Sequence, residues 1–245
     1  MTELRKKLLN ISAVALVVLA LAGCATSFDK RGVYHKVRGG ESIQRIAKIY
    51  RTDVQTLAEY NNIFDAKNIK TGMRLYIPPR RKRAGFKKLP FGDDAKVSRA
   101  DWRSAKKRGR KAPSQKIKFY RGRFIWPVNG KVTSGFGIRN GRRHDGLDIS
   151  GKTGTPIKAA AAGKVVFSGA MRGYGKLILV RHKDNMFTAY AHNSRNKVKK
   201  GQKVRQGQVI GKVGRTGRAT GPHLHFEIRH GQTARNPLFF LPKRG

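Results

Sequence analysis

The C-terminal half of the chain contains short runs of alternating hydrophobic and polar residues separated by glycine-rich stretches. The clearest run is residues 223–228, His-Leu-His-Phe-Glu-Ile, in which every second side chain is apolar. Because side chains alternate between the two faces of a strand, Leu224, Phe226 and Ile228 are expected in the core, with the polar residues on the opposite face. Residues 124–241 are therefore predicted to form a mainly antiparallel β domain.

A different pattern marks residues 33–78, where two helical periods lie between two short strands. Residues 34–37 alternate, and residues 74–77 form a second run that ends at two prolines. In the first helix, apolar residues recur at i, i+3, i+4 and i+7, namely Ile43, Ile46, Ala47 and Tyr50. A capping box at Thr52–Gln55 is expected to start the second helix. The segment is predicted to be an α+β module with the order strand, helix, helix, strand.

The N-terminal segment, residues 1–23, has the composition of an export signal. Basic residues 5–7 precede an apolar run of twelve residues, from residue 11 to residue 22. As a helix this run is only about 18 Å long, too short for a bilayer core of about 30 Å. A basic start, a short apolar stretch and small residues at its end are typical of a secretory signal peptide.

The end of this segment reads Leu-Ala-Gly-Cys at 21–24, which resembles the lipobox of bacterial lipoproteins. The resemblance implies that Cys24 is lipidated, becomes the first residue of the mature chain and anchors it to a membrane, with residues 24–32 as a tether. Ala25, rather than Asp, follows the cysteine. By the same resemblance, this implies sorting to the outer membrane of the bacterial cell envelope, facing the periplasm.

The charge of the chain is strongly one-sided. There are 55 Lys and Arg against 13 Asp and Glu, a formal net charge of +42, which excludes the surface of an ordinary cytosolic enzyme. A polyanionic partner and a location beside an anionic surface both fit this charge. Predicted export argues against nucleic acid as the partner. The 38% of hydrophobic residues suffices for compact cores but not for a multispan membrane protein.

Much of the positive charge lies in residues 79–123, between the two segments described above. Residues 80–118 contain 16 Lys and Arg, three acids and few apolar residues. Such a stretch cannot bury enough surface to offset the entropy of ordering, so it is predicted to be a solvated, extended and disordered linker. Its charge either keeps this spacer extended by self-repulsion or docks it on anionic wall polymers or lipopolysaccharide.

Histidines and a carboxylate in the C-terminal domain indicate a metal site. The chain has one cysteine, so a metal there must be held by His and carboxylate side chains. His223 and His225 share one strand face, while His144 and Asp148 can converge if the chain bends at Gly146. His144, Asp148 and one histidine of the pair would supply three N/O ligands. Catalytic Zn²⁺ commonly takes such a set and keeps a fourth position for water.

Residues 33–78 resemble a LysM module in the blocks YHKVRGGESIQRIAKIY, LAEYNNI and IKTGMRLYIP. The resemblance implies binding of N-acetylglucosamine-containing glycan, chiefly peptidoglycan, in a groove between the loops at 39–42 and 61–69. The residues that it indicates as glycan contacts are Gly40, Glu41, Ser42, Asn61 and Asn62.

Residues 126–229 resemble the LytM/lysostaphin-type zinc peptidases in several long blocks in the same order, among them TSGFGIRNGRRHDGLDI, TAYAHNS and ATGPHLHFEI. The resemblance implies one Zn²⁺ per chain and two catalytic histidines that do not bind it. The implied residues are the metal ligands His144, Asp148 and His225 and the catalytic His192 and His223. Asn193 departs from the leucine that the family often has there, which should alter local packing and not the chemistry.

Four other residues near these blocks have less specific interpretations. His182 is expected at the end of a strand and His230 before a glycine turn, both without an essential role. Met171 and Tyr174 lie in the GAMRGYGK hairpin and either border the cleft or cap the core.

These features favour a lipid-anchored zinc endopeptidase that hydrolyses peptide bonds of peptidoglycan and is targeted to the wall by its LysM module. Bound Zn²⁺ would polarise the scissile carbonyl and activate water, while His192 and His223 move protons and stabilise the oxyanion. The main alternative is a non-enzymatic LysM-plus-LytM lipoprotein that has lost its zinc residues and activates an amidase at cell division. A structural tether, the third alternative, requires a vestigial site. The complete set of five residues favours the enzyme.

Overall fold

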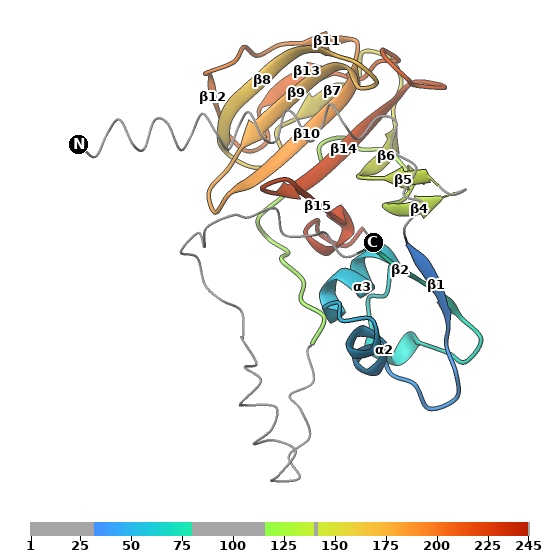
Figure 1. Ribbon diagram of the computed structural model, residues 1–245. Coiled ribbons are helices and arrows are strands. Elements are labelled where there is room, and N and C mark those ends of the chain that lie inside the picture. The colour runs from blue at the N-terminus through green and yellow to red at the C-terminus, as the bar shows by residue number, and fades with distance from the viewer. Residues whose placement is uncertain (1–31, 80–115, 140–141, 245) are drawn as a thin grey trace.

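The computed structural model describes residues 32–79, 116–139 and 142–244 (Figure 1). The predicted signal peptide, the Cys24 lipidation site and most of the predicted linker lie outside the described residues. Within the described ranges, no helix is both long and apolar enough to cross a membrane.

The N-terminal module is α+β, as the sequence predicts. Its strands β1 and β2 pair antiparallel, with Tyr34 opposite Tyr76, and its helices pack their apolar faces on one core. The elements are β1 (Val33–Lys36), α2 (Ile43–Ile49), α3 (Val54–Tyr60), the 3₁₀ turn η1 (Ala66–Asn68) and β2 (Arg74–Ile77).

The cap of α3 differs from the predicted capping box. Asp53 is the N-cap, and its carboxylate accepts a hydrogen bond of 2.7 Å from the backbone N–H of Thr56. Thr52 lies one residue too early for that role. A carboxylate also interacts favourably with the positive end of a helix, so Asp53 is the better cap of the two neighbours. The first helix is capped by Ser42, as expected.

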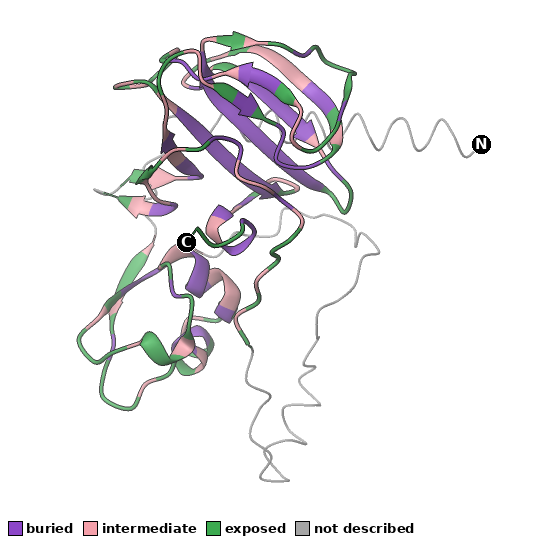
Figure 2. Cartoon of the chain, turned by 180° about the vertical axis from the view of Figure 1, so that it is seen from behind, coloured by how far each residue is buried: buried purple, intermediate pink, exposed green. Residues whose placement is uncertain are grey.

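The C-terminal domain is mainly antiparallel β, also as predicted. Among the described residues its largest sheet has eight strands, in the order β12-β8-β9-β10-β14-β6-β3, with β15 on the side of β14. These strands are β12 (Lys203–Val204), β8 (Gly163–Met171), β9 (Gly175–Arg181), β10 (Met186–Asn193), β14 (His223–His230), β6 (Leu147–Ser150), β3 (Val132–Ser134) and β15 (Thr233–Arg235). Figure 2 shows that the central strands of this sheet are buried along most of their length.

Smaller elements complete the domain. A three-stranded sheet and a two-stranded hairpin accompany the large sheet, and a 3₁₀ turn near the C-terminus lies between the large sheet and α3 (Figure 1). They are β11 (Arg195–Asn196), β13 (Val209–Lys212), β7 (Pro156–Lys158), β4 (Gly137–Arg139), β5 (Arg142–His144) and η2 (Pro237–Phe239).

Strand β14 follows the predicted alternation on its core face. Leu224, Phe226 and Ile228 are fully buried in the main core. The opposite face carries the polar residues, but it too is covered, because Glu227 and Arg229 are fully buried. Two buried charges on one strand face need partners there, and these partners belong to the candidate site.

The C-terminal end of the predicted linker is ordered and packed. Residues 116–123 run along the domain boundary, where the ring of Phe119 stacks on Phe239 with a centroid distance of 5.2 Å. The backbone N–H of Tyr120 donates to the carbonyl of Phe239, and that of Lys118 donates to the side chain of Gln55. The aromatic residues Phe119 and Tyr120 give this end apolar surface to bury.

Candidate metal centre

Three of the predicted site residues converge on one point. His144 ends β5, Asp148 lies in β6 and His225 lies in β14, and one ligand atom from each lies within 4.8 Å of the others. Oδ1 of Asp148 is 3.0 Å from Nε2 of His144 and 2.9 Å from Nδ1 of His225, and these two nitrogens are 3.1 Å apart. These three atoms are the candidate metal ligands.

Strand pairing explains this convergence. Asp148 and His225 are direct cross-strand partners in the antiparallel β6–β14 pair, so their side chains share a face. His144 is brought back by the bend between β5 and β6. At Gly146 in this bend, a Cβ atom would collide with the carbonyl of Phe226 on β14. A glycine at this position lets the bend lie against the sheet.

The outer nitrogen of each ligand histidine has an acceptor. Nδ1 of His144 lies 2.6 Å from the carbonyl of Gly135, and Nε2 of His225 lies 3.1 Å from Oε1 of Glu227. A carbonyl and a carboxylate accept hydrogen bonds, so these ring nitrogens carry the protons. When both rings are neutral, the lone pairs of the inner nitrogens face each other and Asp148, and a ring that gains a proton donates it to Asp148 instead.

This arrangement requires a cation. Three acceptor atoms within about 3 Å of one another repel unless a proton or a metal ion lies between them. Two imidazole nitrogens and one carboxylate oxygen are the donor set that Zn²⁺ takes in catalytic sites. The three side chains remain 10–20% exposed, so the centre can be reached from outside. The residues present therefore fit a zinc ion.

Electrostatics points the same way. Burial disfavours the charged form of Asp148, but hydrogen bonds from His144 and His225 outweigh it and hold its pKa far below the ordinary value. Burial disfavours the imidazolium of His225, but hydrogen bonds to Asp148 and Glu227 raise its pKa to about 9. The same negative and lone-pair atoms that hold this proton can hold a divalent cation. The cation then displaces the proton, so the two compete for the site.

A buried network of charged side chains holds Glu227, the hydrogen-bond acceptor of His225, in place. The hydroxyl of Tyr174 donates to Oε1 of Glu227 at 2.7 Å, and a guanidinium N–H of Arg229 donates to Oε2 at 2.6 Å. Arg229 also lies 3.7 Å from Asp145, which pairs with Arg143. Burial alone would raise the pKa of Glu227, but Arg229 and His225 lower it to about 2.

The sequence interpretation missed this supporting role of Glu227 and Arg229. The available signal was the continued alternation of β14, which puts both charged side chains on the face of His225 inside a strand. The hairpin alternative is now resolved. Tyr174 does both, since it lines the cleft and belongs to the smaller buried cluster, whereas Met171 only packs against that cluster.

The two predicted catalytic histidines lie beside the centre. The rings of His192 and His223 have centroids 4.8 Å apart, and Nε2 of His223 is 3.7 Å from Oδ1 of Asp148. His192 follows Ala191, the cross-strand partner of His225, and its ring centroid is 5.9 Å from that of His225. The three candidate ligands and the two catalytic histidines all line a cleft of about 310 Å³.

A backbone irregularity places His192. The β9–β10 register shifts between Tyr190 and Asn193, and His192 takes a left-handed conformation with φ 63°. A left-handed non-glycine residue at a bulge is strained, and such strain is concentrated at functional sites. Nδ1 of His192 donates to the carbonyl of Thr216 at 2.7 Å, which leaves the lone pair on Nε2.

Burial keeps His192 neutral. Burial is the largest effect and the charge of His225 the next, and together they lower the pKa of His192 to about 4. In the same way as His192, His223 directs Nδ1 to a backbone carbonyl, that of Gly221, at 2.8 Å. Each ring therefore has Nε2 free to accept a proton.

His182 and His230 are remote from the cleft. His182 is buried after β9, with Nδ1 on the carbonyl of Ala162 and Nε2 on the hydroxyl of Thr188, each at 2.8 Å. Burial lowers its pKa to about 4. His230 is exposed at the end of β14. These contacts give His182 a structural role.

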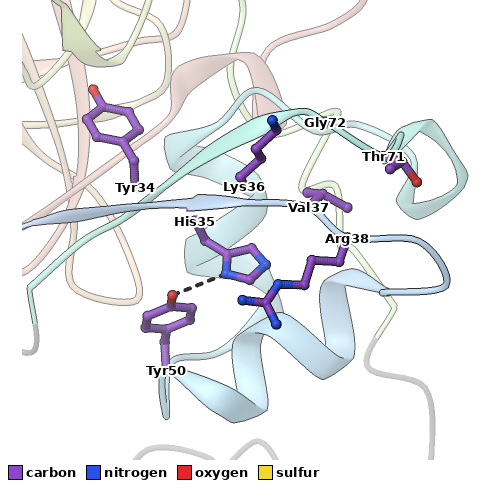
Figure 3. A pocket seen from close by; sticks show the side chains of 8 residues that line it. All are labelled: Tyr34, His35, Lys36, Val37, Arg38, Tyr50, Thr71 and Gly72. Atoms are coloured by element: carbon purple, nitrogen blue, oxygen red, sulfur yellow. Dashed lines mark hydrogen bonds between the residues drawn. The ribbon is translucent and has the colours of Figure 1, made fainter.

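The predicted glycan contacts have local structural partners in the module. The carboxylate of Glu41 lies 2.8 Å from Nε2 of His35, whose Nδ1 is 3.1 Å from the hydroxyl of Tyr50, beside the pocket in Figure 3. Gly40 is a turn residue with φ 72° and Ser42 caps α2. Glycan binding by these residues stays a prediction.

The two asparagines are also engaged. The side chain of Asn61 donates to the carbonyls of Leu57 and Tyr76 and accepts from the N–H of Tyr76. Asn62 accepts a hydrogen bond from Asn236 of the C-terminal domain. Their observed partners are thus within the protein, and their contact with glycan likewise stays a prediction.

Both domains of this chain match known protein families. The LysM domain family matches residues 35–78, and peptidase family M23 matches residues 142–237. The uncharacterized lipoprotein YgeR of Escherichia coli is 36% identical over 250 residues, which cover 99% of this chain and 96% of that protein. The chain belongs to this family of lipoproteins with a LysM domain and an M23 peptidase domain.

Other relatives match about half of the chain. The murein hydrolase activator NlpD of Escherichia coli is 46% identical over 120 residues, which are 49% of this chain and 31% of that protein. The chain therefore spans only about a third of NlpD. The catalytic domain of lysostaphin from Staphylococcus simulans is 35% identical, with a TM-score of 0.41 over 45% of this chain and 90% of that domain.

Proposed function

We propose that the protein is a lipid-anchored zinc metalloendopeptidase that hydrolyses peptide bonds of peptidoglycan. One observation supports this most strongly: the inward lone pairs of His144 and His225 meet the carboxylate of Asp148 around one point. Three acceptor atoms this close repel one another unless a proton or a metal ion lies between them, and their donor set is the one that Zn²⁺ takes in catalytic sites. Two further histidines beside that point supply proton chemistry.

When bound, Zn²⁺ supplies Lewis acidity and lowers the pKa of a coordinated water to about 7. The chain itself supplies the proton transfer groups. Nε2 of His192 and of His223 each carries a lone pair that can accept a proton, and burial keeps His192 neutral before the reaction. Once protonated, either ring becomes a donor that can stabilise negative charge on the carbonyl oxygen or protonate the leaving amine.

The substrate class follows from the two-domain architecture. LysM domains bind peptidoglycan, and family M23 comprises peptidases, so the two domains together fit a peptidase directed to the bacterial wall. The relatives named lipoproteins support an envelope location, with the anchor at Cys24 and the outer membrane as its site. The positive charge of the chain favours adhesion to anionic wall polymers or lipopolysaccharide.

A second candidate function is activation of an amidase at cell division. It is favoured by the relatives named murein hydrolase activators, which are 46% identical over 120 residues. In that case the cleft binds no substrate peptide for cleavage and the partner enzyme cuts the wall. The complete set of metal and proton-transfer residues in this chain supports the enzyme over the activator.

One experiment separates the two. The purified chain, with its zinc content measured, is incubated with purified peptidoglycan, with and without an amidase, and the released ends are identified by mass spectrometry. New peptide ends made by the chain alone, and lost in His225→Ala, are expected for the endopeptidase. Amidase products that increase with the chain, without new peptide ends, would support the activator and contradict the enzyme.

A further inference from the structure

The LysM module is docked on the peptidase domain through a buried ion pair. Glu59, in the last turn of α3, is only 3% exposed. Its carboxylate accepts hydrogen bonds of 2.7 and 2.9 Å from Arg235 of β15, and one of 3.2 Å from the backbone N–H of Asn236. The side chain of Asn236, which is fully buried, donates in return to the carbonyl of Glu59 at 2.9 Å.

Such a contact is specific. A buried carboxylate is costly unless it is both paired and hydrogen-bonded. Gln55 of the same helix donates one hydrogen bond of 2.8 Å to Glu59, whereas the counter-charge, Arg235, comes from the other domain. In a module separated from the peptidase domain, the side chain of Glu59 would be exposed to water. The bidentate Arg235–Glu59 pair fixes the orientation of α3 as well as its position.

Aromatic rings extend this interface on both sides of the ion pair. Phe64 of the module stacks on Phe239 of η2 at 5.0 Å, and Phe119 stacks on the same ring. On the other side, Tyr60 meets Phe136 edge to face at 5.3 Å. Figures 1 and 2 show η2 seated between the sheet and the module helices, consistent with one continuous core.

The Tyr60 contact reaches the metal centre. Phe136 is 3% exposed, and its two neighbours in the chain both touch His144. The carbonyl of Gly135 accepts from Nδ1 of His144, and Gly137 is the cross-strand partner of His144 in the β4–β5 hairpin. Residues 135–137 therefore have the LysM module on one side and a ligand histidine on the other.

The backbone fits closely at the same place. Gly137 has φ 116°, and a Cβ atom added there would lie 2.8 Å from the carbonyl oxygen of Tyr60. The glycine lets the end of α3 approach β4 directly. The hairpin that carries His144 thus rests against helix backbone and not only against flexible side chains.

We propose that the docked LysM module is a positioning element of the metal centre. Glu59 holds α3 on the peptidase domain, and Tyr60 then holds Phe136 and Gly137 beside the acceptor that sets the ring orientation and tautomer of His144. The module then acts on zinc binding through that ligand, in addition to any binding of glycan. This inference rests on the metal centre of the proposed function.

The test compares zinc affinity in the whole chain and in docking variants. Glu59→Arg places two cations together and should undock the module, whereas Glu59→Arg combined with Arg235→Glu restores an opposite pair. Loss of an outer partner of a metal ligand weakens affinity about 10–100-fold. We expect about a tenfold loss in Glu59→Arg and in Tyr60→Ala, with most of the loss recovered in the double charge reversal.

Two further measurements separate positioning from unfolding. The absorption spectrum of the Co²⁺-loaded chain reports ligand geometry and should change in Tyr60→Ala. Amide exchange of the segment around Asn236, whose N–H donates to Glu59, reports docking. The matched control is Ile49→Ala, which truncates a 53%-exposed apolar side chain on α2 of the same module and should leave affinity and spectrum unchanged.

The outcomes distinguish this inference from the proposed function. Wild-type zinc affinity in a Glu59→Arg chain whose exchange shows an undocked module would overturn the inference and leave the metal centre in place. A wild-type chain that binds zinc but cleaves no peptide would refute the endopeptidase only. A wild-type chain that takes up no zinc would overturn both.

Discussion

The carboxylate of Glu227 should control zinc affinity although it does not contact the metal position. It is fully buried and accepts from three donors, Tyr174, His225 and Arg229. Glu227→Gln keeps the size of the side chain but leaves one acceptor oxygen in place of two. At least one donor then loses its acceptor, and the amide N–H group is pushed toward Arg229 or His225.

The expected magnitude follows from these contacts. Removal of an outer partner of a ligand histidine lowers metal affinity about 10–100-fold, or about 1.4–2.7 kcal/mol. Zinc at 100 times its wild-type dissociation constant should stabilise the wild-type fold by about 2.7 kcal/mol, and the Glu227→Gln fold by only about 0.4–1.4 kcal/mol. The zinc-free fold should also weaken, by less than the about 3–5 kcal/mol of a fully unpaired buried charge, because Arg229 loses its nearest carboxylate but keeps Asp145 at 3.7 Å.

The assay is chemical unfolding with and without saturating zinc, together with competition against a chelator. The difference between the two unfolding free energies isolates zinc binding from the stability of the zinc-free fold. Tyr174→Phe is the matched control, since it removes one donor and leaves the carboxylate, and should cost only a few-fold in affinity. A folded Glu227→Gln chain whose zinc affinity is within twofold of wild type would refute the role of Glu227.

Three further outcomes are expected. His192→Ala and His223→Ala should keep zinc and lose at least about a hundredfold in cleavage rate, measured with zinc content on the same samples, since neither is a ligand; wild-type rates in both would contradict the mechanism. His182 has a pKa lowered to about 4 by burial, so the unfolded state binds one more proton below about pH 6.5. Unfolding free energy should therefore fall by up to about 3 kcal/mol as pH falls from 6.5 to 4, with a flatter profile in His182→Gln; equal slopes would show that His182 does not titrate this way. Cys24→Ser should abolish fatty-acid labelling, and should release the protein from membranes where its signal segment is still cleaved; a labelled serine variant would refute the lipobox.

Local patterns carried much of the prediction. The period of two at 223–228 gave both the core face of β14 and the shared face of His223 and His225, because a strand permits only this alternation. The spacing of His144 and Asp148 around Gly146 indicated that they could converge, and the structure brings them together. The α+β order of the N-terminal module followed from its helical period and its flanking strands.

Other features depend on contacts that local patterns do not encode. The acceptor for His144 is a backbone carbonyl, and every residue has one, so no residue type marks Gly135 as its partner. Thr52 and Asp53 are both good caps, and only the geometry of the helix start decides between them. The packed end of the linker depends on Phe239, which is more than a hundred residues away in the chain.

Buried charged residues show where local sequence patterns end and where contacts between distant segments are needed. The alternation of β14 puts Glu227 and Arg229 on the same face as His225, and the structure shows that this face is buried and that the two charges pair there. Glu59 is different, because it lies beside the apolar face of α3 formed by Val54, Leu57 and Ala58 and would face water in an isolated module. Its burial comes from the peptidase domain. An acidic residue beside an apolar helix face therefore becomes evidence of domain docking only when the second domain is known to supply its guanidinium.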